Sequence, residues 1–96
     1  MSYLSTIQDK LRQVKPQLSE KYHVNSIGLF GSIVGTDFKP ESDIDIVVDF
    51  SQPIGIEFVD LADELEKLLD RKVDLVSKDG IRPQYYLSIE PDILYV

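Results

Sequence analysis

A chain of 96 residues can hold one domain with a single modest core and is too short for two. A hydrophobic share of 43% and a charged share of 28% are ordinary for a folded globular protein and exclude a disordered one. The net charge of −7 repels a phosphate backbone, so we expect no direct binding to nucleic acid.

The sequence contains no cysteine, which excludes a disulfide framework and a thiolate metal site. Its first residues, MSYLSTIQDKLRQ, lack the apolar core of a signal peptide, and no apolar run approaches the length of a membrane span. We therefore expect a cytoplasmic protein without membrane contact, built as a single domain over residues 1–96.

The first part of the chain predicts a helix followed by a strand. Apolar residues recur at helical spacing at Leu4, Ile7, Leu11, Val14 and Leu18. Pro16 interrupts this pattern, so we expect either a kink or two short helices, because an interior proline clashes with the preceding turn. VNSIGLFG (24–31) predicts a short strand closed by glycine. Residues 32–42 have loop composition after about one helical turn.

The remainder predicts two more strands and two helices. DIDIVVDF (43–50) is the second strand, and KVDLV (72–76) is the third. Between them, a helix of about four turns is predicted from Ile56, Val59, Ala62, Leu65 and Leu69. Residues 81–88 predict a short helix, and ILYV (93–96) an apolar tail or edge strand. This order indicates an α/β or α+β domain, with a small mixed sheet and helices mainly on one face.

Two acidic residues stand at the start of the second strand. Alternate residues of a strand project from one face, roughly 6.5–7 Å apart, so Asp43 and Asp45 are predicted to point the same way. Carboxylates that close repel each other, and a divalent cation relieves the repulsion. Oxygen ligands at this spacing favour Mg²⁺, with Mn²⁺ as the alternative.

Further residues could complete this site. Asp74 lies within the apolar KVDLV strand, where a lone buried carboxylate needs a partner or a metal. A salt bridge to Arg71 or Lys72 is the alternative role for Asp74. Gly31 allows a ligand to approach the backbone, and the Ser32 hydroxyl at a helix amino terminus would favour a phosphate.

The motif formed by Gly31-Ser32, ten intervening residues and Asp43-Ile44-Asp45 resembles the GS-x10-D-x-D signature of the DNA polymerase β-like nucleotidyltransferases. The segments GLFGS, SDIDIVVDF, KVDLV and the GIRP…ILYV ending resemble, more narrowly, the minimal nucleotidyltransferases (MNT). These are the antitoxins of HEPN/MNT toxin–antitoxin modules. The resemblance covers nearly the whole chain.

The resemblance implies the minimal polymerase β-like fold and a Mg²⁺-dependent protein adenylyltransferase. Asp43, Asp45 and Asp74 would hold two Mg²⁺ ions, and Gly31 and Ser32 would cradle the triphosphate of ATP. The AMP group would pass to a hydroxyl of a partner HEPN toxin, in characterised relatives a tyrosine. Whether the chain forms homo- or hetero-oligomers stays open.

One departure from the family pattern bears on turnover. Relatives commonly read GSxARG, and the ungapped alignment sets Gly35 at the arginine and Thr36 at the second glycine. Lys39 and Arg82 are candidates for the missing charge. The alternative function is a non-catalytic antitoxin that masks its toxin by binding it. Transfer to a small molecule ranks last, because enzymes of that type generally carry an added domain.

Overall fold

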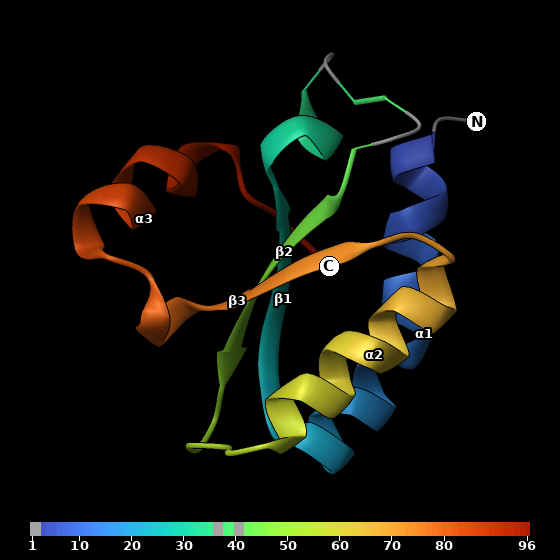
Figure 1. Cartoon of the computed structure of the whole chain (residues 1–96), viewed down its shortest axis with the longest axis vertical. Coiled ribbons are helices and arrows are strands. Elements are labelled where there is room, and N and C mark those ends of the chain that lie inside the picture. The colour runs from blue at the N-terminus through green and yellow to red at the C-terminus, as the bar shows by residue number, and fades with distance from the viewer. Residues whose placement is uncertain (1–2, 36–37, 40–41) are drawn as a thin grey trace.

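The computed structural model describes residues 3–35, 38–39 and 42–96, whose strands form one mixed sheet in the order β3-β2-β1-β4 (Figure 1). The strands are β1 (Val24–Phe30), β2 (Ile44–Phe50), β3 (Val73–Ser77) and β4 (Leu94–Tyr95). β1 runs antiparallel to both β2 and β4, whereas β2 and β3 are parallel. The predicted strands are confirmed, and the carboxyl-terminal ILYV segment contributes an edge strand.

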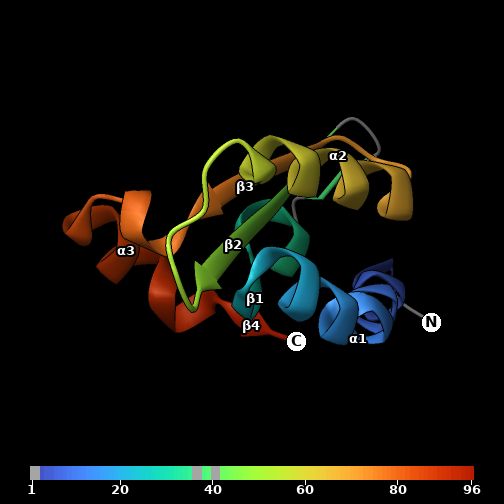
Figure 2. The same cartoon turned by 90° about the horizontal axis from the view of Figure 1, so that it is seen from below.

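The longer helices are α1 (Tyr3–Tyr22), α2 (Glu57–Leu69) and α3 (Pro83–Ile89), and 3₁₀ helices cover Gly31–Val34, Lys78–Gly80 and Glu90–Asp92. α1 and α2 lie side by side on one side of the sheet, and α3 lies on the other (Figures 1 and 2). The predicted α+β architecture, with its helices mainly on one face, is therefore confirmed.

The main core lies between the sheet and the pair α1 and α2. Residues 44, 46 and 48 of β2 alternate toward this side, and Ile44 and Ile46 are fully buried. α1 contributes Ile7 and Leu11 from its amino-terminal half. A smaller cluster, made of Phe30, Val47 and Ile93, occupies the opposite face under α3. Since β2 buries apolar side chains on both faces, a charged residue in β2 needs a partner or a ligand that compensates for its burial.

Pro16 breaks neither α1 nor its register. The helix is continuous from Tyr3 to Tyr22 with Pro16 inside it, so two separate helices were the wrong alternative. An interior proline costs about 3 kcal/mol. Burial of Leu11 and Leu18 on either side of it offsets that cost, at roughly 1.5–3 kcal/mol for each side chain.

α2 begins one residue later and buries a narrower stripe than the sequence predicted. Leu61, Leu65 and Leu69, spaced four residues apart, are its buried side chains. Ile56 is 80% exposed and Val59 is 58% exposed, so both were wrongly assigned to the core face. Ile56 immediately precedes α2, which removes it from the helical periodicity. None of the helices in the described residues is both long and apolar enough to span a membrane.

Candidate active site

Asp45 and Asp74 stand opposite each other where β2 and β3 run in parallel. Paired residues of a ladder project from the same face, so both carboxylates lie on the side of the sheet away from α1 and α2. The negative charge of Asp74 therefore acts directly on Asp45. The ladder brings these two candidate site residues together, and we call them the acidic pair.

Asp43 lies beside this pair but outside the strand. β2 begins at Ile44, one residue later than predicted, so Asp43 is exposed and has no ladder partner. Its negative charge nevertheless acts on Asp45. All three aspartates are therefore gathered at one end of the β2–β3 ladder, although Asp43 is not held by the sheet itself.

The environment of Asp45 opposes its ionisation. Burial raises the pKa of Asp45 to about 6, and repulsion from Asp74 and Asp43 acts in the same direction. Asp45 is the half-buried member of the group, since it lies on the central strand beside the Phe30–Val47–Ile93 cluster. A carboxylate in this position gains stability from a proton or from a cation.

Asp74 is exposed, which corrects the expectation that it is buried in its strand. β3 forms one edge of the sheet, and only the face that carries Val73 and Leu75 packs against the main core. The alternative salt bridge from Asp74 to Arg71 or Lys72 is not among the ion pairs of the described residues. The open side of Asp74 leaves it accessible to solvent and to a substrate.

Gly31 lies directly against Asp45. Phe30 is the ladder partner of Asp45, and the next residue, Gly31, has a φ of 74°, a conformation that favours glycine. A Cβ atom added to Gly31 would overlap the Asp45 carboxylate. The chain reversal after β1 therefore requires glycine both for its backbone angle and for room beside the carboxylate.

Ser32 follows within a 3₁₀ helix of four residues, Gly31–Val34, in agreement with the single helical turn predicted after β1. Its carbonyl accepts a hydrogen bond from the Gly35 N–H at 3.1 Å, and its side chain is half-buried. Gly35, at the position of the family arginine, is exposed, and Thr36 lies outside the described residues. The candidates for a replacement charge, Lys39 and Arg82, are both exposed.

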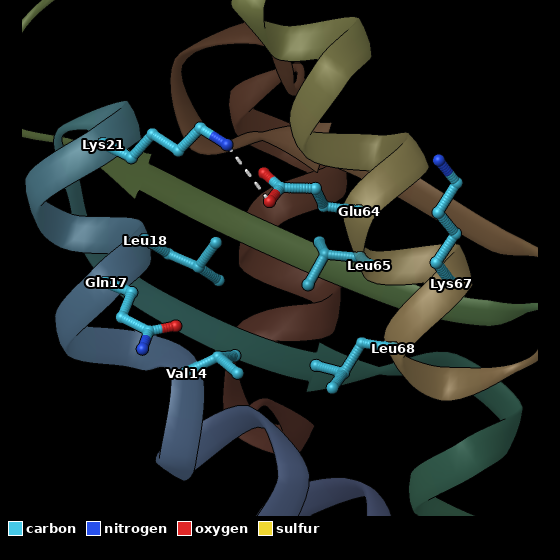
Figure 3. Close-up of a pocket in the computed structure, with 8 residues that line it drawn as sticks. All are labelled: Val14, Gln17, Leu18, Lys21, Glu64, Leu65, Lys67 and Leu68. Atoms are coloured by element: carbon cyan, nitrogen blue, oxygen red, sulfur yellow. Dashed lines mark hydrogen bonds and ion pairs between the residues drawn. The ribbon is translucent and has the colours of Figure 1, made fainter.

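A cavity of about 480 Å³ opens beside Gly31. Its walls come from the Gly31–Val34 turn and from the segment between α3 and β4, with Gly31, Gly35, Ile89 and Leu94 among its lining residues. A somewhat larger groove of about 530 Å³ runs between α1 and α2, where Lys21 donates a hydrogen bond to Glu64 at 3.2 Å (Figure 3). That groove lies on the helical side of the sheet, away from the acidic pair. The smaller cavity shares Gly31 with the candidate site, and Asp43, Asp45 and Asp74 are not among its lining residues.

Oxygen donors and a close backbone approach together suit a divalent cation and a phosphate. In residues 3–35, 38–39 and 42–96, no three histidine, cysteine, aspartate or glutamate side chains stand close enough to hold one metal ion as they are. Asp43 is exposed and lies ahead of β2, so its side chain has room to rotate toward the acidic pair. The donor set fits a metal, provided that Asp43 moves.

Comparison with known proteins agrees with this arrangement. The nucleotidyltransferase domain family matches residues 11–95. MJ0128 of Methanocaldococcus jannaschii, provisionally named as a protein adenylyltransferase, is 46% identical over the full length of both chains. The protein adenylyltransferase MntA of Thermococcus cleftensis is 37% identical, over 100% of this chain and 98% of its own.

Solved structures share the fold. A structure provisionally described as a minimal nucleotidyltransferase superimposes with a TM-score of 0.80 at 25% identity, over 95% of this chain and 93% of that one. The MNT antitoxin structure in complex with a tri-AMPylated Shewanella oneidensis HEPN toxin matches with a TM-score of 0.70 at 22% identity, over 96% of this chain and 70% of that one. The chain therefore belongs to the nucleotidyltransferase family and, within it, to the MntA-like protein adenylyltransferases.

Proposed function

We propose that residues 1–96 form a single nucleotidyltransferase domain that acts as the antitoxin of a toxin–antitoxin pair in the cytoplasm. It transfers AMP from ATP to a hydroxyl of a HEPN toxin. The observation that carries this proposal is the face-to-face placement of Asp45 and Asp74 beside Gly31, in a chain related over its full length to MntA. The partner is inferred from the solved complex of an MNT antitoxin with an AMPylated HEPN toxin.

Asp43, Asp45 and Asp74 are the proposed ligands of two Mg²⁺ ions, for which Mn²⁺ could substitute. The raised pKa of Asp45 supports this assignment, because a cation would offset the burial of that carboxylate and its repulsion from Asp74 and Asp43. When bound, the ions would supply positive charge that stabilises the phosphate oxygens and the leaving pyrophosphate. Oxygen-only ligands suit this pair of metals.

Gly31 and Ser32 are the proposed contacts of the ATP triphosphate. Without a side chain, Gly31 leaves its backbone open to a ligand beside Asp45, and the Ser32 hydroxyl can donate to a phosphate oxygen. The cavity of about 480 Å³ that Gly31 lines has room for part of a nucleotide. Its opposite wall, between α3 and β4, would hold the remainder of the substrate in place.

In the proposed reaction, the oxygen of the toxin hydroxyl forms a bond to the α-phosphorus of ATP. The bond from that phosphorus to the bridging oxygen breaks, and pyrophosphate leaves with the electron pair. Asp74 accepts the proton of the attacking hydroxyl, since it is exposed on the open side of the acidic pair. Asp45, which is more buried and lies on the central strand β2, orients the reacting groups from the side of the sheet.

The test is incubation of the chain with the partner toxin, Mg²⁺ and ATP labelled on the α-phosphate. We expect label on the toxin and its loss in Asp43→Asn. Asp49→Asn is the matched control, because Asp49 lies at the far end of β2 and accepts a hydrogen bond from Asn25 at 3.3 Å. If Asp43→Asn still silences the toxin and the wild type leaves it unlabelled, the chain is a masking antitoxin instead.

A further inference from the structure

Arg71 joins the start of β3 to the loop that precedes Asp43. One guanidinium nitrogen, Nη2, donates hydrogen bonds to the carbonyl of Lys39 at 3.0 Å and to the carbonyl of Ser42 at 2.6 Å. The same two residues are bonded to each other, since the Ser42 N–H donates to the Lys39 carbonyl at 2.9 Å. Arg71 therefore holds both Lys39 and Ser42, the residue directly before Asp43.

Two aromatic rings hold the guanidinium in this position. Its central carbon lies 4.8 Å from the centre of the Phe38 ring and 5.5 Å from that of the Tyr3 ring. The two rings stack on each other, with centres 5.4 Å apart and planes at 19°. Arginine suits this environment because its planar, delocalised charge both stacks on rings and donates hydrogen bonds. Arg71 consequently links the beginning of α1, the loop and β3.

These contacts hold the backbone on both sides of Asp43. On one side, Arg71 binds the Ser42 carbonyl; on the other, the N–H of Ile44 donates to the Lys72 carbonyl at 2.9 Å. Asp43 has no ladder partner of its own. Its place relative to Asp74 is set by Arg71 and Lys72, which precede Asp74 by three and two residues in the chain. The position of Asp43 is therefore set from both sides, by Arg71 at Ser42 and by the start of the β2–β3 ladder at Ile44.

We propose that Arg71 is a positioning residue, which holds Asp43 within reach of the acidic pair and thereby sets the affinity of the site for its divalent cation. This inference rests on the proposed function, in which Asp43 is a metal ligand. Groups that orient metal ligands typically change metal affinity 10- to 100-fold when they are removed. The guanidinium itself is occupied by backbone carbonyls and rings, so we assign it no contact with the phosphates.

The test measures Mn²⁺ binding to the full chain in the presence of AMP-PNP, by electron paramagnetic resonance of free Mn²⁺. Arg71→Met, which removes the donors, should weaken Mn²⁺ binding about 10-fold or more. Arg71→Lys, which restores the charge and a donor on a shorter side chain, should recover part of the affinity. Phe38→Leu, which removes one ring only, should weaken binding about 3-fold. The matched control is Arg12→Met, because Arg12 pairs with Asp9 on the exposed surface of α1 and should leave binding unchanged.

Activity gives a second readout. In Arg71→Met the Mg²⁺ concentration for half-maximal AMP transfer should rise by the same factor as the Mn²⁺ dissociation constant, and saturating Mg²⁺ should restore most of the rate. Lowered thermal stability with unchanged Mn²⁺ affinity, in either Arg71 variant or in Phe38→Leu, overturns the inference and leaves the proposed function standing. Wild-type affinity in Asp43→Asn overturns both.

Discussion

Asp45 and Asp74 face each other across the parallel ladder of β2 and β3. Their proximity opposes ionisation of Asp45 in particular, because Asp45 is the more buried of the two. Such a pair destabilises a protein without its ligand. The left-handed Gly31, whose added Cβ would overlap the Asp45 carboxylate, leaves room for that side chain at this end of the sheet.

Asp45→Asn should stabilise the metal-free protein while it abolishes AMP transfer. A neutral amide removes the cost of burying the charge and the repulsion from Asp74 and Asp43, a gain of about 1 kcal/mol once solvent screening is allowed for. For a domain of this size the melting temperature should rise by roughly 4–8 °C. The measurement is a thermal melt at pH 7.5 with EDTA. A lower melting temperature in Asp45→Asn, with Asp49→Asn unchanged, would contradict this account of the site.

The stability difference between Asp45→Asn and the wild type should depend on pH. The pKa of Asp45 is raised from 3.8 to about 6 in the folded protein, so the folded state keeps a proton that the unfolded state has already lost. The wild type therefore loses stability as pH rises from about 4 through 6. The advantage of the variant should be small at pH 4 and fully developed by pH 7. Urea unfolding of both proteins with EDTA across this range measures it, and a constant difference would refute the assignment.

Gly31→Ala should abolish activity and destabilise the fold by about 1–3 kcal/mol. The substitution forces a left-handed backbone at φ 74° on alanine and drives its Cβ into the Asp45 carboxylate. Gly35→Ala is the control, because a Cβ there has the Ser32 carbonyl oxygen as its nearest neighbour, at 3.8 Å. Its stability should stay within about 0.5 kcal/mol of the wild type. Chemical denaturation and labelled-ATP transfer measure both variants; equal losses in both would refute the special role of Gly31.

Leu65→Ala should cost about 2–5 kcal/mol of unfolding free energy, because Leu65 is 1% exposed in the core under α2. Val59→Ala, on the same helix but 58% exposed, should change it by no more than about 0.5 kcal/mol. Urea denaturation of the two variants compares the two faces of α2 directly. A large loss in Val59→Ala would mean that this side of the helix is covered in solution.

The differences between prediction and structure share one physical origin. Sequence patterns located the three longer strands and the three α-helices of the described residues. They could not say where β3 lies in the sheet, so the exposure of Asp74 was missed. It also extended β2 to Asp43, because a residue beside a strand cannot be told from one inside it without the ladder. The alternative of two helices divided at Pro16 was wrong, because local helix propensity does not include the tertiary burial that keeps α1 continuous.

The sequence by itself determined the alternation that sets Asp45 apart from the core, the glycine that must follow β1, and the family motif formed by residues 31, 32, 43 and 45. These three features depend on local chain geometry, which can be predicted from the spacing of residues close together in the sequence. Only the tertiary structure decided that Asp74 meets Asp45, that Gly31 touches the same carboxylate, and that Arg71 reaches the loop before Asp43. Those contacts join residues distant in the chain, and their register is set by how α1 and α2 pack the sheet, which no local pattern encodes.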